Sequence, residues 1–70
     1  MSIKYYYSEI QNLIERYSHR VETTNPGEIM ANQRIYETMI QVMRDLIDRN
    51  EYQIQQGIKT IETNLLILGL

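Results

Sequence analysis

His19 is the only histidine of the chain and the first residue whose type could support acid–base or metal chemistry. Glu15 precedes it by four residues, so both side chains would lie on one face of a helix. Such a pair could hold a metal ion or transfer a proton. A solvated surface pair has the same spacing, and no nucleophile, base and orienting group can be combined around it. We therefore expect a surface pair and no enzymatic activity.

Other cofactor chemistry finds no matching residues in the sequence. The chain has no cysteine and one histidine, which leaves too few ligands for a structural zinc site. The inward Glu-x-x-His pattern of di-iron helical bundles is missing, and three scattered glycines cannot form a phosphate-binding loop. We expect neither a metal ion nor an organic cofactor.

Aromatic and basic residues near the N-terminus form a second candidate site, because rings and arginines can hold bases or a nucleotide. The candidates for this partner or anion patch are Tyr5, Arg16, His19 and Arg20. Arg16 and Arg20 lie one helical turn apart and would form a modest basic spot. The three consecutive tyrosines at 5–7 would spread around most of a helix, so they cannot form one platform. A solvated face explains the same residues, and both interpretations stay open.

The size of the chain bears on how it is stabilised. Seventy residues make one domain, and a core of this size contributes roughly 3–5 kcal/mol, so such folds usually need reinforcement. Disulfides are excluded because cysteine is absent. Association of several copies is the reinforcement that we expect.

The charge balance bears on the class of partner. Seven Lys and Arg against nine Asp and Glu give a net charge of −2, which does not favour binding to nucleic acid or to a membrane surface. With 43% apolar residues, the chain is not typical of a disordered acidic segment. No apolar run is long enough to span a bilayer and no signal peptide is visible, so we expect a soluble, cytoplasmic protein.

The elements that would position these residues are helical, and the pattern predicts an all-α fold. A first helix is expected over about 3–22, because apolar residues recur there at steps of three and four. They are Ile3, Tyr6, Tyr7, Ile10, Leu13, Ile14, Tyr17 and Val21. Ser2 or Ser8 could cap its start, and the stripe favours Ser2. A short strand over 3–7 is the alternative.

Residues 23–27 form the clearest break in the chain. Asn25 is a candidate N-cap, and Pro26 suits the first position of a helix. Glu28 suits the first turn, where its carboxylate favours the helix dipole and can bond back to the backbone N–H of the cap. Three start signals therefore coincide at the beginning of a second helix.

The second helix is expected to run from 26 to about 68, on the order of 60 Å. Its apolar stripe comprises Ile29, Tyr36, Met39, Ile40, Met43, Leu46, Ile47, Ile54, Ile58, Ile61, Leu65 and Leu68. The stripe keeps its helical phase through 48–51, where there is no glycine or proline, and this favours one continuous helix. A kink could lie near 50–57, and Gly57 is the weakest point. The alternative is a three-helix bundle with a turn near 48–51, in which Asn50 caps a third helix.

The first helix is too short to cover all of the second in an antiparallel hairpin. Apolar residues beyond residue 50 would then have no partner within the chain, so we expect them to form the interface of a homodimer or higher oligomer. The predicted interface residues are Ile54, Ile58, Ile61, Leu65 and Leu68. The assembly would be a helical bundle with coiled-coil packing. Asn50, where the stripe changes flank, is predicted to set the register, unless it is simply exposed.

The sequence names no specific function. The favoured hypothesis is a homo-oligomeric helical protein–protein interaction module, such as an adaptor, an assembly factor or an inhibitor of a partner protein. If residues 3–7 were a strand, the element order would resemble ribbon-helix-helix DNA-binding regulators in outline, although Lys4 is the only cation in that segment. A third hypothesis is an oligomer that sequesters a small anionic ligand near Arg16 and Arg20.

Overall fold

The computed structural model describes residues 2–19 and 21–70. These residues form three helices and contain no strand: α1 spans Ile3–Tyr17, α2 spans Pro26–Ile47 and α3 spans Glu51–Ile67. The prediction of an all-α fold is confirmed. The prediction of one helix from 26 to 68 is wrong, and the alternative of three helices is confirmed.

Helix α1 begins where the apolar stripe predicted. The hydroxyl of Ser2 accepts a hydrogen bond from the backbone N–H of Tyr5 at 3.3 Å, which satisfies one of the free donors of the first turn. The alternative of a strand over 3–7 is therefore wrong. The helix ends at Tyr17, earlier than predicted, and the Ser18 hydroxyl there donates to the carbonyl oxygen of Glu15 at 2.6 Å.

Helix α2 begins as the start signals predicted, with one difference. The side-chain oxygen of Asn25 accepts from the backbone N–H of Gly27 at 2.8 Å and of Glu28 at 3.3 Å, and Pro26 is the first helical residue. The carboxylate of Glu28 does not bond back to the cap. It accepts instead from the hydroxyl of Thr23 at 3.0 Å, and the same hydroxyl oxygen accepts from the Asn25 N–H at 3.0 Å.

The break between α2 and α3 is a Schellman motif without glycine. Arg49 adopts a positive φ of 56°, the left-handed conformation that usually calls for glycine. Its N–H donates to the carbonyl oxygen of Leu46 at 3.2 Å, and the Asn50 N–H donates to that of Asp45 at 2.9 Å. The Asn50 side chain then caps α3, since its oxygen accepts from the N–H of Gln53 at 3.3 Å.

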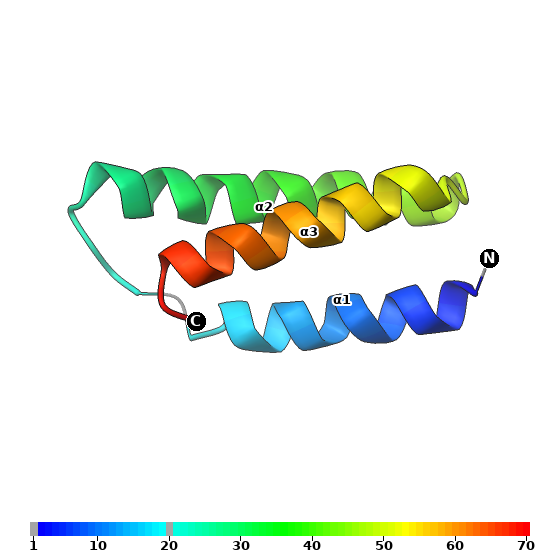
Figure 1. The fold of residues 1–70 in the computed structure, drawn as a ribbon, viewed down its shortest axis with the longest axis horizontal. Helices are drawn as coiled ribbons and strands as arrows, with labels where there is room; N and C mark the ends of the chain where they lie inside the picture. Colours follow the sequence, from blue (N-terminus) through cyan, green and yellow to red (C-terminus); the bar gives the residue numbers. More distant parts are fainter. Residues whose placement is uncertain (1, 20) are drawn as a thin grey trace.

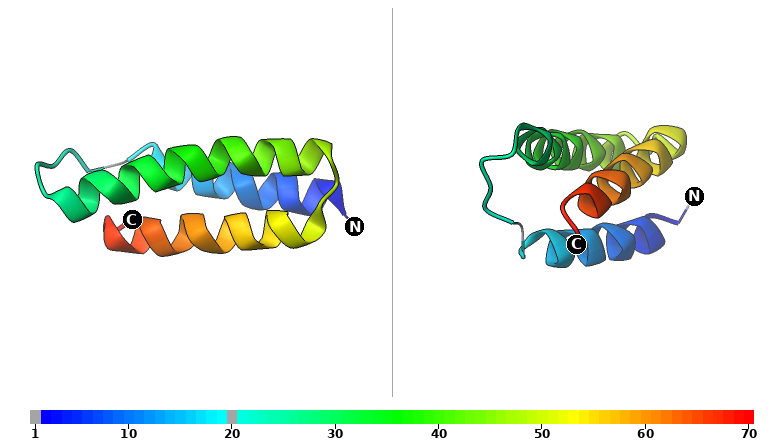
Figure 2. Two further views of the ribbon diagram at one scale, coloured as in Figure 1. Left: turned by 90° about the horizontal axis from the view of Figure 1, so that it is seen from above. Right: turned by 60° about the vertical axis from the view of Figure 1, so that its left-hand side comes forward.

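The three helices lie side by side and alternate in direction. Helices α1 and α3 run the same way and α2 runs against them, with α3 placed between the other two in the view of Figure 1. Helix α1 packs mainly against α3 and makes few contacts with α2. The views in Figure 2 show it to one side of the α2–α3 pair. The longest dimension is 39 Å, so the predicted rod of about 60 Å does not exist.

The core draws apolar side chains from all three helices. Its buried members are Tyr6, Ile10, Leu13, Ala31, Ile35, Val42, Ile54, Ile61, Leu65 and Leu68. Hydrogen bonds add to the packing of α1. The amide of Gln55 on α3 donates to the Tyr6 hydroxyl at 2.8 Å, and the Tyr17 hydroxyl donates to the carbonyl oxygen of Asn32 on α2 at 3.1 Å.

Helices α2 and α3 approach closely at Gly57. A Cβ atom at that position would overlap the Cγ2 methyl group of Val42, and Val42 is itself buried. The absence of a side chain at Gly57 therefore sets the separation of the two helices at this point. The glycine is a packing contact within α3 and not the kink that the sequence indicated.

Candidate functional site

Helix α2 has two apolar faces. The face in the core carries the buried side chains of Ala31, Ile35 and Val42, and the half-buried Met39 and Leu46 pack against the same core. The second face is rotated by roughly 100–150° around the helix, as the spacing of 100° per residue requires. It carries five large apolar side chains, namely Ile29, Tyr36, Ile40, Met43 and Ile47.

We call these five residues the α2 seam. Each of the five is exposed, from 44% for Ile40 to 81% for Ile47. Their positions from Tyr36 onward follow steps of four, three and four, which is the spacing of side chains that meet a partner helix in a coiled coil. A second face of large apolar side chains on α2 is therefore turned to solvent.

The surroundings of the α2 seam extend its apolar character. A hollow of about 330 Å³ lies beside it, lined by Tyr17 of α1 and by Ile29, Asn32, Gln33 and Tyr36 of α2. The side-chain oxygen of Asn32 is buried there and has no hydrogen-bond partner among residues 2–19 and 21–70. On α1, Tyr7 and Ile14 are also exposed. Both lie roughly 80–100° around α1 from Tyr6, the residue that contacts Gln55.

Two opposite charges border the α2 seam. Glu37 and Arg44 are exposed, seven residues apart, and each lies next in sequence to a seam residue. By helical geometry both fall on the edge of the seam that points away from the core. We call this edge the charged rim. It carries the carboxylate of Glu37 at one end and the guanidinium of Arg44 at the other.

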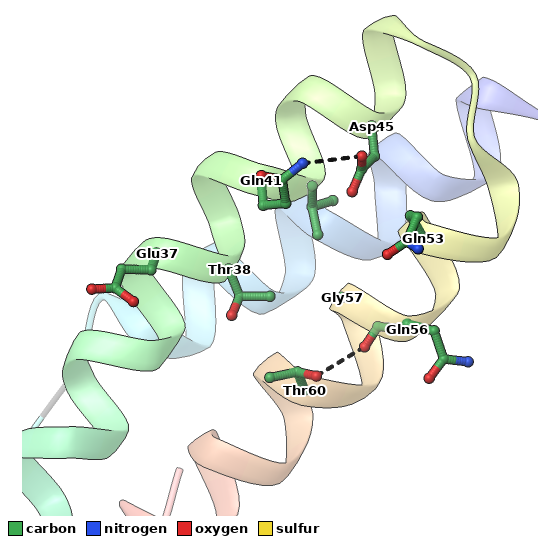
Figure 3. A pocket seen from close by; sticks show the side chains of 9 residues that line it. Glu37, Thr38, Gln41, Asp45, Gln53, Gln56, Gly57 and Thr60 are labelled. Carbon is green, nitrogen blue, oxygen red and sulfur yellow. Dashed lines mark hydrogen bonds between the residues drawn. The ribbon is translucent and has the colours of Figure 1, made fainter.

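A second surface feature, a polar groove, lies between α2 and α3 on the other side of α2 (Figure 3). It measures about 270 Å³, and Thr38, Gln41 and Asp45 line it from α2. Asp45 is 6% exposed, and Gln41 donates to one of its oxygens at 3.2 Å. Gln53 of α3 lies across the groove from Asp45 in Figure 3. Asp45 thus places a nearly buried carboxylate in the last turn of α2, where the helix dipole disfavours negative charge.

The residues predicted to form an oligomer interface lie elsewhere than expected. Ile54, Ile61, Leu65 and Leu68 are buried in the core of the single chain, and Ile58 is half-buried against it. Because α3 folds back along α2, these residues do not lie on an uncovered end of a long second helix. The spacing identified the buried face of α3 correctly, but the partner of that face is the rest of the chain.

Asn50 has a different role from the one predicted. It is exposed at the start of α3, where it caps the helix, so it does not lie in an apolar seam and cannot set a register there.

The predicted partner or anion patch is not brought together by α1. Tyr5 and Arg16 are eleven residues apart on that helix, a separation of about 16 Å along its axis. The Arg16 guanidinium donates to the carbonyl oxygen of Leu70 at 2.8 Å. His19 is exposed just after the helix, and Arg20 lies outside the described residues. The ribbon-helix-helix outline also fails, because residues 3–7 are helical.

Sequence reasoning missed the α2 seam as a surface, although it named the residues. The predicted stripe contains all five seam residues, in the part of the second helix that the predicted hairpin covers with the first helix. It does not contain Ala31, Ile35 and Val42. The sequence of α2 contains two apolar stripes. The second stripe can be recognised only when Ala31, Ile35 and Val42 are assigned to the core.

Within residues 2–19 and 21–70, no group of three or more His, Cys, Asp or Glu side chains is placed to hold a metal ion. None of the helices in the described part of the chain has the length and apolar character needed to cross a membrane. No protein-family model, curated protein or solved structure matches the chain.

Proposed function

We propose that this protein is a homo-oligomeric helical interaction module, an adaptor, assembly factor or inhibitor, and that it associates through the α2 seam. The observation that carries the proposal is that α2 exposes five large apolar side chains on one face, opposite no other part of the described chain. Soluble proteins rarely keep a large contiguous apolar patch on the surface unless it binds a partner. The sequence analysis predicted the interface within residues 54–68, and the present proposal places it on α2 instead.

The size of the α2 seam indicates a moderate affinity. Five partly exposed side chains of this kind offer on the order of 500 Å² of apolar surface per copy. Two seams in contact would bury about 1,000 Å², at the lower end of specific interfaces. We therefore expect self-association in the micromolar range and a mixture of species at low concentration.

Light scattering coupled to size-exclusion chromatography tests this proposal over a wide range of protein concentration. Ile47→Asp places a charge at the most exposed seam residue and should yield a monomer with unchanged helical content. Leu66→Asp is the matched control, because Leu66 is also apolar, 71% exposed and outside the seam. The control should associate like the wild type. A wild-type monomer at the highest concentration, or equal loss of association in both variants, would contradict the proposal.

A further inference from the structure

The geometry of the α2 seam restricts how a second copy can meet it. From Tyr36 to Ile47 the seam has two columns, one containing Tyr36 and Met43 and the other Ile40 and Ile47. Paired helices of this type pack such columns in layers. A second copy could run parallel or antiparallel, and in the antiparallel case it could be shifted by one heptad.

We infer that two copies pair their α2 helices antiparallel, with the charged rim of one copy against the same rim of the other. This inference rests on the proposed function, because it specifies the partner of the α2 seam. In this register Ile40 lies opposite the partner's Met43. Tyr36 lies opposite the partner's Ile47, and the twofold symmetry repeats both layers.

The charges on the rim select this register. In an antiparallel pair with twofold symmetry, the charged rims of the two α2 helices lie on the same side of the pair. They run in opposite directions along it. Glu37 then faces the partner's Arg44, and Arg44 faces the partner's Glu37. Both are exposed at the border of the seam, where opposite charges chiefly determine orientation and partner choice.

The competing arrangements lose this complementarity. A shift by one heptad brings Glu37 opposite the partner's Glu37 and places Gln33, a polar residue, in an apolar layer. A parallel pair places Tyr36 beside the partner's Tyr36 and brings no opposite charges together along the rim. Like charges placed opposite one another are destabilising, so the rim charges disfavour the shifted register. The parallel pair lacks the attraction between Glu37 and Arg44 that the antiparallel register gains.

Charge reversal tests the pairing by sedimentation or light scattering. Glu37→Arg should raise the dissociation constant by about tenfold, because two symmetry-related attractions become repulsions. Arg44→Glu should do the same. The double variant E37R/R44E restores opposite charges, and its dissociation constant should return to within about threefold of the wild-type value. Circular dichroism of each variant should match the wild type, since both positions are exposed.

Cross-linking separates the register from the association itself. The chain has no cysteine, so single cysteine variants carry one reactive thiol each. A mixture of Glu37→Cys and Arg44→Cys treated with a short bismaleimide should give a covalent heterodimer in high yield. Glu37→Cys alone should give little, whereas a shifted register would cross-link it efficiently. If the protein associates but the mixed cross-linked product does not form, or E37R/R44E does not restore association, the antiparallel register is wrong. These results leave the proposed self-association itself intact. Absence of any association overturns the proposed function as well.

Discussion

The substitution Gly57→Ala measures how closely α2 and α3 approach. A Cβ atom at Gly57 would overlap the Cγ2 methyl of Val42, which is 1% exposed. Valine in a helix has one strongly preferred χ1 rotamer, so Val42 cannot turn this methyl away at low cost. The two helices, or the backbone of one of them, must therefore move when a methyl group is added at position 57.

Two opposing effects set the magnitude of the change. Alanine is favoured over glycine inside a helix by about 1 kcal/mol. Overpacking of a close contact costs about 1–3 kcal/mol, and the overlap here places the cost toward the upper value. We expect Gly57→Ala to lower the free energy of unfolding by about 1–2 kcal/mol. That is a large share of the roughly 3–5 kcal/mol available to a domain of this size.

Val42→Ala supplies a matched partner for a double-mutant cycle. Alone it removes two buried methyl groups and should lower the free energy of unfolding by about 1–2 kcal/mol. In the double variant the methyl at position 57 enters the space that the valine vacated. The double variant should therefore be within about 0.5 kcal/mol of the wild type, with a coupling energy of about 2–3 kcal/mol.

Urea unfolding followed by circular dichroism at low temperature gives the four free energies. Low temperature keeps both single variants sufficiently folded in the absence of urea to define the folded-state baseline of the unfolding curve. The close contact would be refuted if Gly57→Ala were as stable as the wild type. Additive losses in the double variant would refute it equally, because they would mean that the two positions do not share space.

The helix ends and the polar groove yield predictions for four further substitutions, each checked by urea unfolding. Arg49→Gly should raise the free energy of unfolding by about 0.5–1 kcal/mol, because glycine relieves the positive φ; Gly69→Ala, at φ 74°, should lower it as the converse case. Asn50→Ala should lower it by about 1 kcal/mol through loss of the cap, and an unchanged value would exclude capping. Asp45→Asn should raise it by about 0.5–1 kcal/mol, since it removes a nearly buried charge from the negative end of α2, and a loss would show that the carboxylate is compensated.

Features that depend on neighbours in the sequence could be predicted. The caps at Ser2 and Asn25 and the proline at the start of α2 act through hydrogen bonds and a fixed φ within a few residues. Their positions in the structure agree with the prediction. The buried face of α3 could also be predicted, because it is the only strongly apolar face on that helix and its spacing has one interpretation.

The break after α2 could not be predicted by the same reasoning. Apolar spacing counts residues along the chain, and Ile47 and Ile54 stay seven apart whether the helix continues or reverses. The residue in the left-handed conformation is Arg49, which carries no turn signal in the sequence. The cap formed by Asn50 with Gln53 was the one available indication, and it was outweighed by the continuity of the stripe.

The exposed seam and the close helix contact follow from one packing requirement. At Gly57, where α2 and α3 approach closely, the face of α2 that meets α3 carries Val42 and Thr38. Bulky residues such as Tyr36 and Met43 would force the helices apart, so the fold turns them outward. The close contact at Gly57 thus limits the size of the side chains on this part of α2, and the large side chains of the α2 seam lie on the exposed face.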